Sequence, residues 1–251
     1  MPKVSLIAAK ANQLFKPFSS SNLIYAFSHR HNNNMSLCYG NTSDSLNNRK
    51  SFLSNLRINY NDLVCAKQVH GSQIKYAKEE DRGRGALGYD SSVSDIDAFI
   101  TDKKNLPLAI FTADCLPVFL YEPATSAIGL IHAGWRSSKE GIAVTTIELM
   151  KKYFNSRADN LYVWFGPAIR ECCYEVGEEF NNLRPYGIAE RNSRYYLDLV
   201  GINKKQVLDL GVKEINIFDP KICTSCQNEE FFSYRREGKT CGRMMSVIML
   251  K

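Results

Sequence analysis

Two apolar runs in the middle of the chain each lead to a side chain that binds soft or borderline metal ions. Residues 106–136 read LPLAIFTADCLPVFLYEPATSAIGLIHAGWR, so Cys115 follows the run that ends in FTAD and His132 follows AIGLI. His70 follows a third stretch, LVCAKQV. Because strands on a rigid scaffold can aim the side chains at their ends toward a common point, we expect these three residues to converge.

Two imidazoles and one thiolate form a coherent ligand set for zinc. Three protein ligands leave a fourth position for water or substrate, which distinguishes a catalytic zinc site from a structural one. Zinc with an open position can activate water as a nucleophile near neutral pH. The residues alone leave another interpretation equally open, in which His70 and His132 are satisfied polar residues and Cys115 belongs to the core. The other two histidines, His29 and His31, lie in an asparagine-rich segment and are interpreted as exposed loop residues.

The elements that must position these residues are mostly strands. Apolar runs predict strands at residues 63–69, 98–101, 108–112, 117–121, 127–131, 161–165 and 246–250. Several runs are continuous rather than alternating, which is typical of strands that are covered on both faces. The strands outnumber the predicted helices and do not alternate regularly with them. The sequence therefore predicts an α+β (mixed α/β) fold, with layered, sandwich-like mixed sheets flanked by helices, rather than a doubly wound sheet.

Three helices are predicted, at residues 47–56, 138–154 and 198–210. The second begins with the pattern Ser137-x-x-Glu140, which is a capping box with Ser137 as N-cap. Its first N–H groups would then lie just after HAGWR, where they would favour an anion. The third helix has Asp198 as its expected N-cap and Gly211 as the residue just beyond its C-terminus.

Composition limits the class of protein. With 251 residues, 44% of them hydrophobic, the chain can bury a full core, and we expect a single domain over residues 1–251. The 32 Lys and Arg against 26 Asp and Glu are scattered, without the basic stripe of a nucleic-acid-binding protein, and favour small anions such as phosphate. No stretch reaches the length of a membrane span, and no signal sequence is evident, so a cytoplasmic protein is expected.

The eight cysteines argue against a disulfide framework in a reducing compartment. The pair Cys223-x-x-Cys226 resembles half of a structural zinc site, but such a site needs a second pair of ligands. Cys241 is the only nearby candidate, so we interpret Cys223 and Cys226 as reduced cysteines without a metal. The adjacent Cys172 and Cys173 are interpreted as packing residues.

A set of short motifs along the chain resembles one known family. In chain order they are NR at 48–49, KQVHG at 67–71, DAFITD at 97–102, TADC at 112–115, HAGWR at 132–136, GPAI at 166–169, CYEVG at 173–177, DL at 198–199, CT at 223–224 and FSYRR at 232–236. The chain resembles the YfiH-like or laccase-domain family, also called multicopper polyphenol oxidase-like proteins and peptidoglycan editing factors. The combination of TADC, HAGWR and CYEVG makes this resemblance specific.

The resemblance implies a layered CNF1/YfiH-like fold and a zinc site formed by His70, Cys115 and His132, with Arg49 at the same pocket. It also implies a purine nucleoside enzyme with phosphate as co-substrate. Such an enzyme phosphorolyses adenosine, inosine, guanosine and methylthioadenosine to free base and ribose 1-phosphate, and deaminates adenosine to inosine. Its partners would be small molecules, without nucleic acid or membrane, and the protein would be a monomer or homodimer.

Phosphorolysis requires a group that holds phosphate, and the forked guanidinium of arginine serves this best. Arg49 is the first choice. Arg136 and Arg235 also belong to the family motifs, although an arginine in such a motif can instead bridge strands. Ser137 stands where the family usually has a glycine, directly after HAGWR. This difference bears on how closely phosphate can approach the backbone there.

Three further motif residues have two interpretations each. Asp114, next to Cys115, is a candidate proton carrier for the ammonia that leaves during deamination, or a buried carboxylate that accepts backbone N–H groups. Tyr174 and Tyr234 are candidates for stacking on the purine ring, or they are core and rim residues.

Other functions stay open at this stage. A multicopper phenol oxidase would need roughly ten histidines, which a chain with four cannot supply, but a single copper at the same three ligands could oxidise phenols. An editing hydrolase for peptidoglycan precursors could use Cys115 as a thiolate nucleophile beside His132. A metal-binding or protein-interaction module without turnover is the third alternative.

Overall fold

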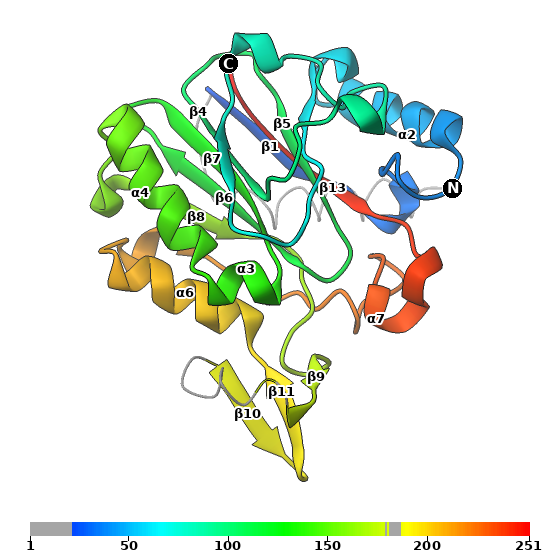
Figure 1. Ribbon diagram of the computed structural model, residues 1–251, viewed down its shortest axis with the longest axis vertical. Coiled ribbons are helices and arrows are strands. Elements are labelled where there is room, and N and C mark those ends of the chain that lie inside the picture. The colour runs from blue at the N-terminus through cyan, green and yellow to red at the C-terminus, as the bar shows by residue number, and fades with distance from the viewer. Residues whose placement is uncertain (1–21, 179, 181–186) are drawn as a thin grey trace, which may run out of the picture.

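Two mixed β-sheets lie face to face at the centre of the molecule (Figure 1). The computed structural model describes residues 22–178, 180 and 187–251. The six-stranded sheet has the order β12 (Ile217–Phe218), β8 (Tyr162–Phe165), β6 (Leu116–Glu122), β7 (Ala127–Ala133), β4 (Ala98–Thr101) and β3 (Ile74–Tyr76). The four-stranded sheet has the order β1 (Leu23–Phe27), β13 (Met244–Leu250), β5 (Leu108–Thr112) and β2 (Val64–Cys65). Each sheet contains parallel and antiparallel pairs, so the predicted mixed, layered fold is confirmed.

Helices cover the two outer faces. The helices α4 (Ile142–Phe154) and α6 (Leu199–Asp209) pack on the six-stranded sheet, and α2 (Thr42–Ser54) packs on the four-stranded sheet (Figure 1). A third, small antiparallel sheet projects from the lower end of Figure 1; its order is β10 (Ile188–Arg191), β11 (Arg194–Leu197) and β9 (Glu175–Val176). None of the described helices is long and apolar enough to cross a membrane.

The continuous apolar runs have a simple explanation in this architecture. In β6, Phe119 and Tyr121 point into the core between the two sheets, whereas Val118 and Leu120 point toward the helices. Successive side chains of a strand alternate between faces, so a strand with both faces covered needs apolar residues at every position. The same alternation in β7 places His132 on the same face as Leu130, at the end of the core between the sheets.

Most of the predicted strands are confirmed. The bounds of β4 and β5 agree with the prediction, and β6, β7, β8 and β13 differ from it by one or two residues at an end. The strand predicted at residues 63–69 is wrong beyond Cys65. There the chain leaves β5, and the Lys67 N–H donates to the Val93 carbonyl (2.8 Å) instead. Residues 66–70 therefore leave the sheet and turn toward the end of β7.

The helix predicted at residues 138–154 is two helices. Gly141 has a left-handed conformation (φ 76°) and separates α3 (Trp135–Lys139) from α4. Ser137 is therefore not an N-cap. It lies inside α3, where its Oγ accepts the Gly134 N–H (2.9 Å). The N–H groups after HAGWR, which were expected to attract an anion, belong to α3, a helix of five residues. One of them, the Ser138 N–H, is already paired with the Gly134 carbonyl.

The other two predicted helices are present. The helix α2 begins earlier than predicted, at Thr42, because the Asn41 side chain accepts the N–H groups of Ser43 and Asp44. The prediction for α6 is confirmed at both ends. The Asp198 carboxylate accepts the Gly201 N–H (2.8 Å), and Gly211 follows the helix with φ 93°.

Candidate active site

His70, Cys115 and His132 converge at one end of the sheets. Their ligand atoms all lie within 4.8 Å of one another, and the two imidazole rings meet edge to face with centroids 4.7 Å apart. Cys115 directly precedes β6 and His132 lies in β7; these strands pair antiparallel, with Leu116 opposite Ala133. His70 reaches the same point from the loop after β2, where its backbone is left-handed (φ 60°). The expected convergence is therefore present.

A buried carboxylate, Asp97, organises this cluster. Its Oδ1 lies 2.6 Å from Nδ1 of His132 and accepts the His70 N–H (3.0 Å), while Oδ2 accepts the Gly71 N–H (2.7 Å) and the Val69 N–H (3.2 Å). One side chain thus fixes both the ring of His132 and the loop that carries His70. Because Nδ1 of His132 is occupied, Nε2 is the nitrogen directed to the cluster. A carboxylate on the far nitrogen of a histidine ligand is the usual support of a zinc site.

The thiol of Cys115 and the imidazole of His132 shift each other's ionisation. Burial raises the pKa of Cys115, but the charge of His132 and hydrogen bonds from both histidines outweigh it and lower this pKa to about 6. Burial lowers the pKa of His132, but the Cys115 thiolate and Asp97 raise it to about 9. The lowered pKa favours the thiolate of Cys115, the form of cysteine that binds metal ions and attacks electrophiles.

Gly134, in the HAGWR motif, lies close to this cluster. A Cβ there would lie 3.2 Å from Cδ2 of His70 and 3.4 Å from Sγ of Cys115. The first distance is a tight contact, so a side chain at this position would require His70 to shift by a few tenths of an ångström.

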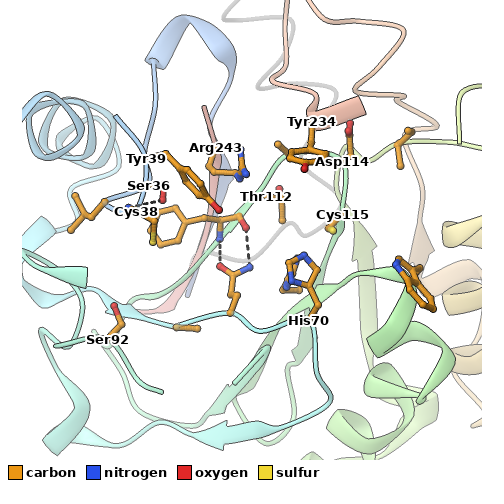
Figure 2. A pocket seen from close by; sticks show the side chains of 18 of the residues that line it. Ser36, Cys38, Tyr39, His70, Ser92, Thr112, Asp114, Cys115, Tyr234 and Arg243 are labelled. Atoms are coloured by element: carbon orange, nitrogen blue, oxygen red, sulfur yellow. Dashed lines mark hydrogen bonds between the residues drawn. The ribbon is translucent and has the colours of Figure 1, made fainter. Parts of the chain in front are cut away.

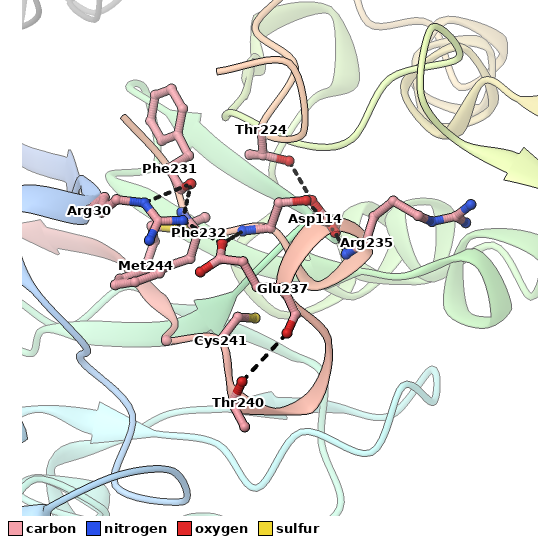
Figure 3. A network of polar contacts seen from close by, with 12 residues as sticks. Arg30, Asp114, Thr224, Phe231, Phe232, Arg235, Glu237, Thr240, Cys241 and Met244 are labelled. Carbon is pink, nitrogen blue, oxygen red and sulfur yellow. Dashed lines mark hydrogen bonds and ion pairs between the residues drawn. The ribbon is translucent and has the colours of Figure 1, made fainter. Parts of the chain in front are cut away.

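Asp114 has the hydrogen bonds of a structural carboxylate. Its Oδ1 accepts the Thr224 hydroxyl (2.7 Å), and Oδ2 accepts the Ser233 hydroxyl (3.1 Å) and the Arg235 N–H (2.7 Å), as Figure 3 shows in part. These bonds join the start of β6 to two distant segments near the C-terminus. Of the two interpretations that the sequence left open, these contacts favour the structural one.

The cluster opens into a cavity of about 780 Å³. Figure 2 shows His70 and Cys115 at one side of it, Tyr39 and Arg243 at the other, and Tyr234 beside Asp114. The charged residues that line it are four arginines and one aspartate: Arg49, Arg136, Arg235, Arg243 and Asp114. Because arginines outnumber carboxylates among the described lining residues, the cavity favours an anionic ligand.

The four arginines differ in how their guanidinium groups are used. Arg49 is buried, and it donates to the carbonyls of Met35 (2.8 Å), Gly85 (2.9 Å) and Ala86 (2.9 Å) while lying over the ring of Phe111. Its Nε and Nη1 thus hold together the loops of the cavity wall. Arg49 lies at the pocket, as expected. Its Nε and Nη1 already donate to these carbonyls, so they are not available to bind phosphate.

Arg136 and Arg235 are exposed, and both line the cavity. Arg136 stacks on Trp135 (4.8 Å) and Arg235 on Tyr174 (5.4 Å). Within the described part of the chain, neither guanidinium has an acidic partner within ion-pair distance. Burial raises the pKa of the Tyr174 phenol, and the two arginines oppose that shift, which places both charges near this ring.

Two aromatic residues form the outer wall. Tyr234 is 46% exposed, and the guanidinium of Arg243 lies 5.9 Å from its ring and 4.3 Å from the ring of Tyr39. Tyr174, by contrast, is largely covered. Of the two tyrosines proposed to stack on a planar ligand, Tyr234 has the accessible ring.

The sequence interpretation missed Asp97, Tyr39 and Arg243. Asp97 begins the DAFITD motif, and its position directly before β4 was the available signal. Tyr39 and Arg243 come from opposite ends of the chain, and tertiary contacts bring their segments together: β1 pairs with β13, and the Met35 N–H donates to the Arg243 carbonyl. Nothing in the local sequence of either residue indicates the cavity.

Two expectations about the remaining ligand-type residues have different outcomes. His31 is exposed, as expected, but the side chain of His29 is only 15% exposed and stacks on the ring of Phe231, so the interpretation of His29 as an exposed residue is wrong; both lie beside Glu230 and neither lines the cavity. All four cysteines are free, as expected, but the premise that Cys223 and Cys226 lack a second pair of ligands nearby is wrong. Cys172, Cys173, Cys223 and Cys226 gather in one place, with sulfur atoms within 4.8 Å of one another, so the second pair of ligands exists. It comes from about fifty residues earlier in the chain.

Comparisons with known proteins agree with this structure. A family model described as multi-copper polyphenol oxidoreductase laccase matches residues 24–251. The purine nucleoside phosphorylase YlmD of Geobacillus stearothermophilus is 36% identical over 225 residues, which are 86% of this chain and 82% of that protein. An adenosine deaminase, RL5, from an unknown prokaryotic organism is 27% identical over 215 residues, 82% of each chain. The crystal structure of YlmD from G. stearothermophilus has a TM-score of 0.88 and 33% identity, and the match covers 94% of each chain. The chain therefore belongs to the multi-copper polyphenol oxidoreductase laccase family, which confirms the resemblance indicated by its motifs.

Proposed function

We propose that the chain is a zinc-dependent purine nucleoside enzyme. It phosphorolyses adenosine, inosine, guanosine and methylthioadenosine to the free base and the ribose 1-phosphate, and it deaminates adenosine to inosine. The observation that carries this proposal is a three-ligand cluster beside a cavity that four arginines line. The names of the relatives, a purine nucleoside phosphorylase and an adenosine deaminase, support the same substrate class.

Zinc suits the ligands, which are His70, Cys115 and His132. Two imidazoles and one thiolate within 4.8 Å of one another, with a carboxylate behind His132, match a zinc site with an open position. When bound there, zinc supplies a Lewis acid and lowers the pKa of water, the chemistry that attack on C6 of adenine requires. Gly134 and Asp97 keep the three ligands at the spacing that this site needs.

Arg235 and Arg136 are the proposed phosphate ligands. Both are near the cluster, both are exposed to the cavity, and neither has an acidic partner among the described residues. A forked guanidinium binds a phosphate through two hydrogen bonds and fixes its orientation. Arg49 serves the same reaction by holding the cavity wall in place through its three carbonyl contacts.

The nucleobase is proposed to lie against Tyr234, with Tyr174 nearer the reacting atoms. Tyr234 presents an exposed ring at the outer wall, and Arg243 lies near the same face of the cavity. Planar purines stack well on such rings. Asp114 contributes by anchoring the turn that carries Cys115, because its oxygens already accept three donors.

The family description mentions several coppers, but the chain does not have the ligands for them. A multicopper oxidase needs roughly ten histidines, and the whole sequence contains four. Two of these, His29 and His31, lie outside the cavity. A single copper at the three-ligand cluster is the form of oxidase that the residues could support.

One observation favours a second candidate function. Cys115, His132 and Asp97 place a thiol, a histidine ring and an orienting carboxylate in sequence, which is also the arrangement of a thiol hydrolase. Such an enzyme could edit peptidoglycan precursors. Its thiolate must be free of metal, so removal of zinc would activate a thiol hydrolase and inactivate the nucleoside enzyme.

Incubation of metal-quantified protein with adenosine, inosine and methylthioadenosine tests the proposal. With phosphate, chromatography is expected to show adenine, hypoxanthine and methylthio-ribose phosphate products that are absent without phosphate. Adenosine alone is expected to give inosine. If zinc is present and no nucleoside is converted under either condition, the proposed function is wrong.

Replacing Arg235 by alanine is expected to raise the KM for phosphate about 10-fold, with a smaller change in the KM for inosine, because a charge-assisted contact is lost. Arg236→Ala is the matched control, since Arg236 is exposed next to Arg235 but does not line the cavity. Initial rates at varied phosphate measure both variants. Equal phosphate KM values for the two variants would remove Arg235 from the phosphate site.

A further inference from the structure

Four cysteines outside the cavity form a second cluster. Cys172 and Cys173 lie in the turn after β8, and Cys223 and Cys226 lie between β12 and α7 (Tyr234–Glu237). The sulfur of Cys226 is 3.5 Å from that of Cys172 and 3.3 Å from that of Cys173. All four sulfurs lie within 4.8 Å of one another. Cys223 is buried, while Cys172 and Cys226 reach the surface.

This spacing fits a metal better than a disulfide. A disulfide holds its sulfurs about 2 Å apart, and the four cysteines here are free. Four sulfurs at about 2.3 Å from a tetrahedral zinc lie roughly 3.8 Å from one another. The cluster therefore needs only small side-chain movements to enclose one ion. Two pairs of sulfurs would have to approach much more closely to form bridges.

Main-chain contacts hold the two segments together without help from the sulfurs. Ala168 and Cys223 form a parallel β-bridge, in which the Thr224 N–H donates to the Ala168 carbonyl (3.0 Å). The Arg170 guanidinium donates to the Ile222 carbonyl (3.2 Å) and forms an ion pair with Asp219. The scaffold thus delivers the two pairs of cysteines to one point before any ion binds, which lowers the ordering cost of binding.

The surroundings suit an anionic ligand set. The backbone N–H groups of Arg170 and Cys226 point to the sulfur of Cys223. The Arg191 guanidinium donates to the carbonyl of Glu171, next to Cys172. Hydrogen bonds and positive charge around metal-bound sulfurs are the outer-shell support that thiolate sites require.

We propose that Cys172, Cys173, Cys223 and Cys226 bind one structural Zn²⁺. Four thiolates complete the tetrahedral coordination of zinc and leave no open position, so the site stabilises and does not catalyse. This site is separate from the three-ligand cluster, and it does not depend on the proposed nucleoside activity.

The position of the site gives it a second consequence. Tyr174, next to Cys173, lines the cavity, and Thr224, next to Cys223, donates to Asp114 (2.7 Å) beside Cys115. An ion bound by the four cysteines would tie together the two segments that carry these residues. Loss of the ion is therefore expected to lower thermal stability and to loosen this wall of the cavity.

Metal content in a Cys115→Ala background tests the site without relying on the first cluster. Protein purified under reducing conditions, loaded with Zn²⁺ and desalted, is expected to retain about one zinc per chain by mass spectrometry. Adding Cys226→Ser is expected to remove that zinc, whereas adding Cys38→Ser, a change at an exposed cysteine outside both clusters, is expected to leave it. Cys226 reaches the surface, so serine is tolerated there sterically.

Two results would overturn the proposal. One is a Cys115→Ala protein that retains no zinc, or whose zinc survives Cys226→Ser. The other is a disulfide within this cluster. It would lower the intact mass of the purified protein that keeps all four cysteines by two hydrogens, and mapping would place the bridge among them. As a second readout, Co²⁺ in place of Zn²⁺ is expected to show thiolate-to-cobalt charge transfer from a tetrahedral site in the Cys115→Ala protein, and none after Cys226→Ser.

Discussion

Replacement of Cys115 by alanine is expected to abolish both phosphorolysis and deamination, and to remove one bound zinc per chain. Cys115 supplies the only thiolate of the three-ligand cluster, and His70 and His132 alone leave too few ligands for tight binding. The rate is expected to fall by more than about 100-fold. Loss of a residue that only supports a metal ligand can already cost up to about 100-fold, and Cys115 is itself a ligand. Zinc analysis and the nucleoside assay on the same preparation measure the two losses together.

Histidine variants provide the matched control for this result. His70→Ala is expected to reproduce both losses, whereas His31→Ala, at an exposed histidine outside the cavity, is expected to keep the zinc and the activity. A folded Cys115→Ala protein that phosphorolyses inosine at the wild-type rate would show that the cluster has no part in that reaction. Thermal unfolding of each variant identifies any that have lost the fold.

The second large effect is expected for Asp97→Asn. The substitution keeps the size of the side chain, but an amide group cannot accept from His132, His70, Gly71 and Val69 together, so some of these donors lose their partner. Zinc affinity is expected to fall about 10- to 100-fold, as for other carboxylates behind a histidine ligand. The free energy of unfolding is expected to fall by about 3 kcal/mol or more, because Asp97 is fully buried.

Asp95→Asn is the control for this substitution, since Asp95 lies two residues away, is exposed and makes none of these contacts. Competition with a chelating dye measures zinc affinity, and urea unfolding measures stability. Wild-type zinc affinity in Asp97→Asn would mean that the carboxylate supports only the loop and not the ligand.

The central strands could be predicted because burial on both faces leaves a strong signal. Continuous apolar runs mark β5, β6 and β7, which have sheet neighbours on both sides and other layers above and below. The strands β3, β9 and β12 contain two or three residues each, and they carry no such run. Their strand conformation comes from pairing with a neighbour, which one segment of sequence does not reveal.

The site could be predicted in part for a related reason. Cys115 directly precedes β6 and His132 lies near the end of β7, so their convergence follows from the antiparallel pairing of these two apolar strands. The break between α3 and α4 was hidden, because the apolar face from Ile142 onward continues the helical pattern that Gly141 interrupts. The four-cysteine cluster was hidden by distance along the chain, since its two halves meet only through tertiary contacts such as the bridge between Ala168 and Cys223.

Phosphorus NMR of the zinc-loaded protein with inosine and inorganic phosphate tests the central claim most directly. The account predicts the resonance of ribose 1-phosphate, growing in step with hypoxanthine and absent from the Cys115→Ala protein. Free ribose with unchanged phosphate would show hydrolysis instead, and unchanged inosine would contradict the assignment of this cavity to purine nucleosides.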